Sequence, residues 1–489
     1  MSENQKLSKG KFTLLGFQHM FAMFGATVLV PALTGLSVSA TLLFAGLGTL
    51  LFHLITKGKV PAFLGSSFAF LGGYAAVSKL AETNPGMNWV AYAGVGVAVA
   101  GLIYVIVSIL FRWLGTARVM RFFPPIVTGP IIICIGMILA NSAINNCAAN
   151  WPIAILAVGI VIVFNIWGKG MFKIIPILLG VVGSYVIAAL LALLFGETTD
   201  VTSVQTLHEV VTQSGTVVTT TFNQVTGSNI TLFGNSNLVL FDAAAVEAIK
   251  NADWIGLPFS WNDTVFALAG NTDWSLLISA IAIMAPISLA TMMEHIGDMS
   301  AISSTVGKNF IKEPGLHRSL LGDGLATAMA ALFGAPANTT YGENTGVLAL
   351  TRVYNPSVVR MAAVLAILFS FCPKFAALVS CMPAATIGGV SLILYGMISA
   401  VGVRNIVENK VDFAKSRNVI IAAVIMSLAL GISFSNAGAI IFTIGEVEIS
   451  LSGLAVASLV GIILNAILPG NDYVFGKNEE GDQAVNFKV

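Results

Sequence analysis

The feature that most constrains this chain is a succession of fourteen apolar runs, most of them as long as a membrane-spanning helix. A helix needs roughly 20 residues to cross the hydrocarbon core of a bilayer. Charged residues are only 10% of the chain, far fewer than the roughly 25% of a soluble domain. We therefore predict an all-α polytopic membrane protein with 14 transmembrane segments. The runs cover residues 12–36, 38–56, 60–80, 89–111, 123–142, 151–167, 174–195, 275–297, 319–334, 336–352, 358–380, 384–403, 418–435 and 451–469.

The basic residues support this count and set an orientation. If residues 1–11 lie in the cytoplasm, an even number of spans returns the C-terminal end to the same side. Of the 24 Lys and Arg residues, 21 then lie on the cytoplasmic side, and only Lys79, Lys250 and Lys374 lie outside. Cytoplasmic loops are enriched in Lys and Arg. We expect a multi-pass protein of the cell (inner or plasma) membrane with cytoplasmic N- and C-termini.

Two runs contain polar, glycine-broken sequence at membrane depth. The third begins with Pro61 and contains Gly65-Ser66-Ser67, and the tenth begins with Pro336 and contains Asn338-Thr339-Thr340. Non-helical backbone at this depth is tolerated only where protein encloses it or where it lines a cavity. We expect spans 3 and 10 to be broken, each with a short β-piece followed by a half-helix.

A long polar stretch divides the spans into two sets of seven, so the second set is inverted relative to the first. The fifth and twelfth runs share the pattern G-x6-G-M-I-x-A, at residues 129–140 and 389–400. Inverted repeats with paired broken helices are typical of secondary transporters whose substrate binds near the membrane midplane. We predict a first inverted repeat at 1–195 (spans 1–7), an extracytoplasmic loop insertion at 196–272, a second inverted repeat at 273–470 (spans 8–14) and a cytoplasmic tail at 471–489.

The insertion alternates Val and Thr around residues 216–221, which indicates a small β excursion. We otherwise interpret it as a tolerated, poorly ordered segment rather than a functional one.

Four acidic residues fall within the spans, whereas the other 19 lie in loops, tails or span edges. They are Glu294, Asp298, Asp323 and Glu343. A charge at the bilayer centre costs on the order of 3 kcal/mol or more, so its presence there points to function. Glu294 and Asp298 are four residues apart on one helical face, and two close carboxyls tend not to ionise together. A coupled acid pair facing a cavity can bind a proton. We favour a functional role over a purely structural one for Glu294 and Glu343, and find the two interpretations nearly even for Asp298 and Asp323.

Glu343 follows the extended Asn-Thr-Thr piece, where the half-helix of span 10 should begin. The first N–H groups of a helix have no partner within it and carry the positive end of the helix dipole. Span 3 offers the same arrangement at Ser67-Phe68. Donors from two helix starts beside carboxylate acceptors match a small planar solute with alternating C=O and ring N–H groups better than they match an inorganic anion.

Other residues carry weaker signals. Gln18 and His19 lie in the first span, where a lone histidine is more often a packing and hydrogen-bonding residue than a ligand. Phe68 and Tyr341 could stack on a planar solute, although phenylalanine in such spans usually packs. No Walker A sequence, metal-ligand spacing or nucleophile–base arrangement is present, so we expect no enzyme activity, no metal and no cofactor. A net charge of +1 argues against a nucleic-acid partner.

Several motifs together resemble the nucleobase–ascorbate transporter family, also called nucleobase–cation symporter family 2, and its uracil-carrying members in particular. The family signature [Q/E/P]-N-x-G-x4-T-[R/K/G] fits residues 343–352 at every position, and the Q-H pair of the first span is Gln18-His19. The other matching segments are residues 21–31, 65–70, 294–298 and 314–318. The resemblance covers residues 12–470 apart from most of the insertion.

The resemblance implies a core domain (spans 1–4 and 8–11) and a gate domain (spans 5–7 and 12–14), and a homodimer through the gate domains. It implies that Glu294 and Glu343 bind substrate and that the backbone N–H groups of Phe68 and Gly342 meet the uracil carbonyls. Relatives that carry purines tend to have Gln at the position of Glu343. Some uracil carriers have His where this chain has Asp298, a position tied to proton coupling. Gln18, His19, Asp323 and Asn344 resemble the supporting polar network.

These observations lead us to expect a secondary transporter that imports uracil by proton symport and alternating access, with the lipid bilayer as its surroundings. Sodium is the less favoured coupling ion. Two alternatives stay open: a carrier of xanthine or another purine with the same fold, and an anion exchanger or channel-like carrier with that fold.

Overall fold

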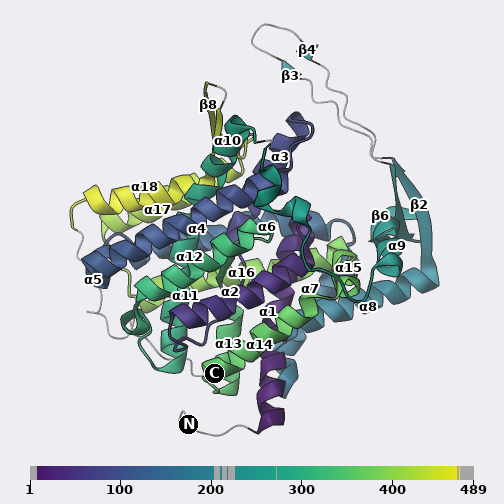
Figure 1. The fold of residues 1–489 in the computed structure, drawn as a ribbon, viewed down its shortest axis with the longest axis horizontal. Helices are drawn as coiled ribbons and strands as arrows, with labels where there is room; N and C mark the ends of the chain where they lie inside the picture. Colours follow the sequence, from purple (N-terminus) through teal and green to yellow (C-terminus); the bar gives the residue numbers. More distant parts are fainter. Residues whose placement is uncertain are drawn as a thin grey trace.

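The first half of the chain forms a bundle of long helices interrupted by one buried strand (Figure 1). A computed structural model describes residues 8–173, 175–202, 210–211, 217–218, 226–270, 272–445, 447–470 and 473. The elements of the first half are α1 (Lys9–Thr34), α2 (Val38–Ile55), β1 (Leu64–Ser66), η1 (Phe68–Phe70), α3 (Leu71–Thr83), α4 (Trp89–Leu114), α5 (Thr116–Val119), α6 (Pro125–Cys147), α7 (Trp151–Trp167), η2 (Gly170–Lys173) and α8 (Pro176–Phe195).

The second half also has one short strand between helices, and it has a hairpin near its end. Its elements are α10 (Trp274–Met284), η5 (Ala285–Ile287), α11 (Ser288–Val306), η6 (Ile311–Gly315), α12 (Leu316–Leu332), β7 (Asn338–Thr340), α13 (Gly342–Thr351), α14 (Pro356–Ser370), α15 (Pro373–Ser380), α16 (Ala384–Glu408), α17 (Ser416–Ser433), β8 (Ala439–Ile444), β9 (Val447–Ser452) and α18 (Gly453–Ile467). Of the predicted tail 471–489, only Tyr473 lies within the described residues.

Polar caps and prolines set where many of these helices begin. The side chains of Ser37, Asn88 and Asn150 each accept a hydrogen bond from a backbone N–H in the first turn of α2, α4 and α7. Pro125 and Pro176 occupy the first positions of α6 and α8, where the missing N–H costs nothing. Capping residues and prolines therefore determine where these apolar helices begin.

The described residues contain eight helices long and apolar enough to cross a membrane, or nine if the bent pair α14–α15 is one span. The prediction of fourteen is larger because several elements at the expected positions are short. Helices α7 and α18 are apolar but have 17 and 15 residues, and α3 and α13 follow strands. A mostly helical, multi-span architecture is thus confirmed.

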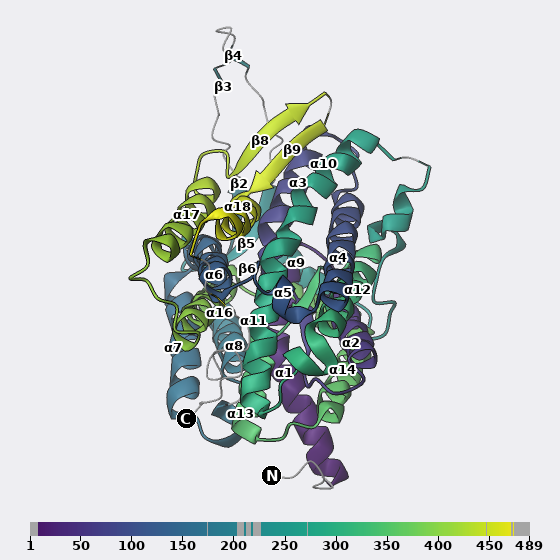
Figure 2. The same ribbon diagram turned by 90° about the vertical axis from the view of Figure 1, so that its left-hand side faces the viewer.

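Two features were not expected from the sequence. The run 358–380 is not one continuous helix, because α14 and α15 meet at an angle of 90° where Cys372 precedes Pro373. The residue before a proline is disfavoured in the helical conformation. The segment between α17 and α18 forms an antiparallel hairpin of β8 and β9, which Figure 2 shows projecting beside α10.

Glycines allow α6 and α16 to pack with their backbones close together. A Cβ on Gly402 would meet the carbonyl oxygen of Gly129 at 2.7 Å, and a Cβ on Gly136 would overlap the carbonyl oxygen of Tyr395. Small residues let helix backbones approach closely in membranes, where lipid offers little hydrophobic driving force for association. These contacts join the two runs that share the G-x6-G-M-I-x-A pattern.

The insertion is more structured than we expected. Its described part contains β2 (Gly196–Thr202), β3 (Val210–Val211), β4 (Val217–Val218), β5 (Thr226–Leu232), β6 (Asn235–Asp242), α9 (Ala243–Asn251), η3 (Trp261–Asp263) and η4 (Val265–Leu268). Strands β2, β5 and β6 form one sheet, beside α9 and the C-terminal end of α8 (Figure 1). Leu240 and Phe241 pack with Cys147 and Cys381. Buried apolar contacts therefore hold this segment against the helices. Of the predicted β excursion, β4 is described, and the remaining residues of 216–221 lie outside the described part.

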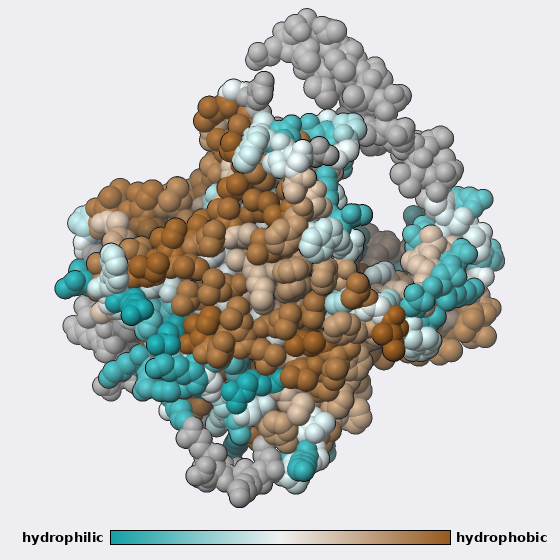
Figure 3. All heavy atoms as spheres, viewed as in Figure 1, coloured by the Kyte–Doolittle hydropathy of each residue, from teal (hydrophilic) through white to brown (hydrophobic). Residues whose placement is uncertain are grey.

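Hydrophobic residues cover a broad part of the molecular surface, as Figure 3 shows for one face. Ile106 on α4, Ile155 on α7 and Leu193 on α8 are among many large apolar side chains that are more than half exposed. A monomeric soluble protein rarely exposes apolar patches of this extent. This surface suits contact with lipid.

Candidate functional site

The site is built on two short strands from opposite halves of the chain. Strands β1 and β7 pair antiparallel, with Gly65 opposite Thr339 at the centre of the register. All six residues of the two strands are buried. These strands are where the sequence predicts extended pieces in the third and tenth apolar runs.

Equivalent threonines hold the two strands in place. Thr49 on α2 accepts a hydrogen bond from the Leu64 N–H at 2.9 Å, and Thr327 on α12 donates to the Asn338 carbonyl at 2.8 Å. Each contact satisfies a strand group in a buried setting, where an unpaired polar group is costly. The strand pair is therefore fixed by side chains from both halves.

A helix begins directly after each strand, so two helix starts lie beside the strand pair. Phe68 opens η1, which continues into α3, and Gly342 opens α13. The Tyr341 N–H is taken up by the Phe63 carbonyl at 3.0 Å, so the helix start proper begins at Gly342. Gly342 is exposed, whereas its neighbour Tyr341 is buried. Each start leaves backbone N–H donors and the positive end of a helix dipole beside the strand pair.

Tyr341 closes the strand pair rather than offering an open stacking face. Its hydroxyl donates to the Ser66 carbonyl at 2.9 Å and accepts from the Thr27 hydroxyl at 3.3 Å. Its ring lies against Gly65, where an added Cβ would be 2.5 Å from the ring. The predicted substrate contact of Tyr341 thus has a structural use that the sequence did not reveal.

Three of the four intramembrane acids lie on helices that pack around the strands. Glu294 is half-buried and Asp298 is buried on α11, and Asp323 is fully buried on α12. Asp298 accepts a hydrogen bond from the Thr340 hydroxyl at 3.0 Å and lies 3.6 Å from where a Cβ on Gly342 would stand. The backbone of Glu343 is the second residue of α13, and its side chain lies outside what the structure describes.

Asp323 does not join this group directly, because a histidine stands between. Its Oδ2 lies 3.0 Å from Nδ1 of His295, and both side chains are fully buried. The same ring nitrogen is 3.3 Å from the Thr340 hydroxyl. Sequence reasoning missed His295, although a histidine beside Glu294 at membrane depth was a signal equal to that of His19.

Gln18, His19 and Asn344 form a second polar group between α1 and α13. The Asn344 side-chain amide donates to the His19 carbonyl at 3.3 Å and lies 3.4 Å from His19 Nδ1. Gln18 Oε1, His19 Nε2 and Asn344 Oδ1 are buried and have no hydrogen-bond partner among the described residues. Buried polar atoms of this kind are normally satisfied by water or a ligand.

Phe68, the first residue of η1, packs against α16. Its ring is buried, with its centroid 5.5 Å from that of Tyr395 in an edge-on arrangement. Tyr395 was not singled out from the sequence, because one tyrosine in an apolar run carries no pattern of its own.

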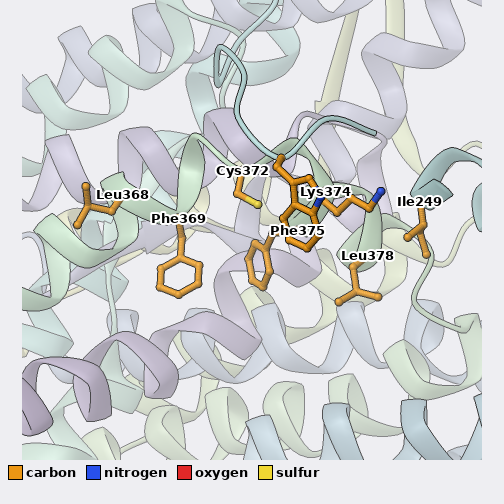
Figure 4. A pocket seen from close by; sticks show the side chains of 8 residues that line it. Ile249, Leu368, Phe369, Cys372, Lys374, Phe375 and Leu378 are labelled. Carbon is orange, nitrogen blue, oxygen red and sulfur yellow. The ribbon is translucent and has the colours of Figure 1, made fainter. Parts of the chain in front are cut away.

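Two cavities among the described residues have no acidic residue in their lining. One, of about 470 Å³, lies between α9, α14 and α15 and is lined by aromatic and aliphatic side chains and by Lys374 (Figure 4). The other, of about 430 Å³, lies between the α1–α3 side and α6 and contains Asn141 and Asn145.

The fold and this site define a polytopic membrane permease built around a buried strand pair. The chain matches the Permease family over residues 10–438, and it belongs to this family. It is 37% identical over 465 residues to the uracil permease of Bacillus subtilis (strain 168), covering 92% of this chain and 91% of that one. It is 37% identical over 474 residues to the uracil permease of Bacillus caldolyticus, covering 94% and 93%.

A solved structure shows the same fold at low sequence identity. The transmembrane domain of the cyanobacterial bicarbonate transporter BicA matches with a TM-score of 0.54 and 12% identity, over 93% of this chain and 96% of that one. The resemblance to uracil carriers stated from the motifs is confirmed, and the relatives are permeases rather than enzymes.

Proposed function

We propose that this chain is a nucleobase permease that imports uracil by proton symport through alternating access. The observation that carries the proposal is that a helix begins after each strand of the buried pair, at Phe68 and at Gly342, and that Gly342 lies close to the Asp298 carboxyl of α11. The names of its relatives support uracil as the substrate. The bilayer is the surrounding partner, and the homodimer through the gate domains stays a prediction.

In this proposal the fourteen spans form two inverted repeats. The five spans beyond the long helices are α7, α12, α18 and the two strand–helix segments β1–α3 and β7–α13. Exchanged packing supports the repeat: α4 packs on α12 as α14 packs on α2, and α6 packs on α17 as α16 packs on α7. The antiparallel strand pair relates the halves in the same way.

The same packing supports a core domain of spans 1–4 and 8–11 and a gate domain of spans 5–7 and 12–14. Helices α2, α4, α12 and α14 pack among themselves, and so do α6, α7, α16 and α17. Phe68 and Tyr395 face each other across the proposed boundary. The distribution of Lys and Arg supports cytoplasmic N- and C-termini in the cell membrane.

For substrate recognition, we assign the backbone N–H groups of Phe68 and Gly342 to the two carbonyls of uracil. Glu294 and Glu343 would accept the ring N–H groups. Charge-assisted hydrogen bonds are roughly twice as strong as neutral ones, which favours an ionised Glu343 as one acceptor. A protonated Glu294 can still accept through its carbonyl oxygen. Protonation of Glu294, shared with Asp298 one turn away, would permit binding, and deprotonation would accompany release inside.

Two other functions have some support. A carrier of xanthine or another purine would use the same fold, although Glu343 favours uracil under the family resemblance. An anion exchanger or channel-like carrier is favoured by one observation, the fold shared with a bicarbonate transporter. Competition of labelled uracil by xanthine tests the first, and conductance without substrate-coupled proton movement would identify the second.

The decisive variants are Glu294→Ala and Glu343→Ala. Each should abolish uracil uptake while the protein still reaches the membrane, because each removes an acceptor for a ring N–H. Glu82→Ala, which changes an exposed acid at the end of α3, should retain wild-type uptake. Wild-type uptake by either site variant would contradict the assignment.

A further inference from the structure

A cavity of about 430 Å³ lies between the C-terminal parts of α1, α6 and α17 and the first half of α3. The insertion is attached beside the same end of α6, since the Val239 N–H donates to the carbonyl of Ala149, which follows this helix. The distribution of Lys and Arg assigns this side of the molecule to the outside. The cavity is therefore on the side from which an imported solute arrives.

One wall of this cavity is polar, although it belongs to an apolar helix. Asn141, Ser142 and Asn145 of α6 line the cavity and are exposed. Asn141 and Asn145 are four residues apart and so lie on the same face of the helix. An amide that faced hydrocarbon would lose its hydrogen bonds with water at a considerable cost. This wall is therefore suited to a water-filled space.

The rest of the lining favours a neutral, planar solute. No Asp, Glu, Lys or Arg is among the described residues that line the cavity, whereas Tyr74, Trp89 and Phe434 contribute aromatic rings. Aromatic side chains stack on any nucleobase, because every base has a π-face. A carboxamide carries an acceptor and a donor side by side, so Asn141 or Asn145 can form two parallel hydrogen bonds with adjacent C=O and N–H groups. The lining matches a neutral ring with an imide or lactam edge.

The cavity also adjoins the elements of the strand-pair site. Leu71 and Gly72 line it and belong to the first turn of α3, which continues directly from the helix start at Phe68. Tyr74 lines it as well, and its hydroxyl accepts a hydrogen bond at 2.9 Å from the N–H of Ala337, the residue before β7. The same helix therefore connects the cavity with the strand pair.

We propose that this cavity is the outer entrance of the transport route and that Asn141 and Asn145 form a waiting site there for a neutral, planar imide, separate from the strand-pair site. This inference rests on the proposed uracil transport. Because α3 belongs to the proposed core domain and α6 to the proposed gate domain, the two walls of the cavity move relative to each other during transport. The solute enters while these walls are apart.

The test measures whether a thiol placed in the cavity reacts from outside and whether uracil slows that reaction. The reporter is Ser78→Cys, because Ser78 lines the cavity from α3 and leaves both asparagines intact. Intact cells are treated with a membrane-impermeant thiol reagent, with and without saturating uracil. We expect the reporter to react and uracil to slow the reaction severalfold. If this variant fails to reach the membrane, Ser433→Cys at the end of α17 replaces it.

Glu343→Ala separates the waiting site from the strand-pair site. It removes a proposed acceptor at the strand pair and lies outside the described lining of the cavity. In this background, uracil should still slow the labelling of the reporter. Protection seen with Glu343 intact but lost in Glu343→Ala would show that the uracil sits only at the strand pair, and would refute the waiting site.

The asparagines are tested in the same reporter and Glu343→Ala background. Asn141→Ala and Asn145→Ala should each raise the uracil concentration that gives half protection by about 3- to 10-fold, the effect of one lost hydrogen bond. Asn146→Ala is the matched control, because Asn146 lies on the same helix but does not line the cavity. Equal effects of the three variants would refute the assignment to Asn141 and Asn145.

Two further controls define the background of the labelling. The protein without a reporter has Cys134, Cys147 and Cys381 buried and Cys372 partly buried. Val186→Cys places a thiol in the middle of α8, where the side chain is 51% exposed on the apolar surface. It should not react above the background, because the reactive form of a thiol is the thiolate and apolar surroundings suppress it.

The outcomes separate this inference from the function beneath it. Reporters on both α3 and α17 that fail to react from outside would refute the entrance. Reaction that uracil slows in neither background would refute the waiting site. Failure of the wild type to take up uracil would instead refute the proposed function, while labelling by the external reagent would still decide whether the cavity is an entrance.

Discussion

At the residue scale, the strand pair requires a glycine at one position, because no side chain fits there. Gly65 lies beneath the Tyr341 ring, and an added Cβ would also meet the Thr27 hydroxyl at 2.7 Å. The absence of a side chain lets Tyr341 cross the strand and bond to the Ser66 carbonyl. Both helix starts are held in position through this contact.

We predict that Gly65→Ala impairs uracil uptake and destabilises the protein by about 1–3 kcal/mol, the usual cost of overpacking a closed site. The matched control is Gly72→Ala in the following helix, where an added Cβ has no neighbour within 4 Å. Thermal unfolding in detergent and uptake in the same preparation provide the measurement. Equal stability of the two variants would show that the ring is free to move away.

The same scale shows how far the sequence could predict the site. The strands, the helix starts and the acids of α11 follow from proline, glycine and charge at membrane depth. The hydrogen bond from Tyr341 to the Ser66 carbonyl and the position of His295 between Asp323 and Thr340 do not follow from such signals. Both depend on contacts between residues 275 or 24 positions apart, such as Tyr341 with Ser66 and His295 with Ser319, which carry no local pattern.

At the element scale, α6 and α16 are the helices whose sequences repeat and whose backbones approach each other. The repeat is not exact in its packing, because equivalent glycines have different neighbours. Gly136 is closed in by the Tyr395 carbonyl and by Ser399, whereas Gly396 has nothing within 4 Å. The sequence pattern located the pair of elements, but only their contact shows which glycine is required.

This difference gives a test within one helix pair. Gly136→Ala should destabilise the protein by about 1–3 kcal/mol, because the methyl group would overlap backbone of the facing helix. Gly396→Ala should change stability by no more than about 1 kcal/mol, since glycine has no packing role there. The two variants are compared by thermal unfolding in detergent. A larger loss in Gly396→Ala would contradict the assigned packing.

Element boundaries also show what the sequence could not supply. Caps and prolines marked most helix starts. The 90° bend between α14 and α15, however, lies within one apolar run, and hydropathy alone does not show whether such a run is straight or bent. The β8–β9 hairpin likewise arises where the chain between two spans is long enough to pair with itself.

At the scale of the whole molecule, the insertion joins the two proposed domains on one side. Its sheet contacts the gate side, where the Val239 N–H donates to the Ala149 carbonyl at 3.1 Å. Its later part contacts α15, where the Lys374 ammonium donates to the carbonyls of Lys250 and Ala252 at 3.1 and 3.2 Å. If the two proposed domains move against each other during transport, these anchor points move relative to each other, and we predict that the insertion limits that motion. Composition alone suggested a loose loop, because the apolar residues that dock it are spread among many polar ones.

The central claim is that the strand-pair site couples uracil to protons, and one measurement tests it most directly. Purified protein in vesicles is given labelled uracil with an inward proton gradient or an inward sodium gradient, one at a time. We predict that the proton gradient drives accumulation above equilibrium, that the sodium gradient does not, and that Glu294→Ala abolishes the response. Accumulation driven by sodium alone, or equilibration that ignores both gradients, would contradict the account.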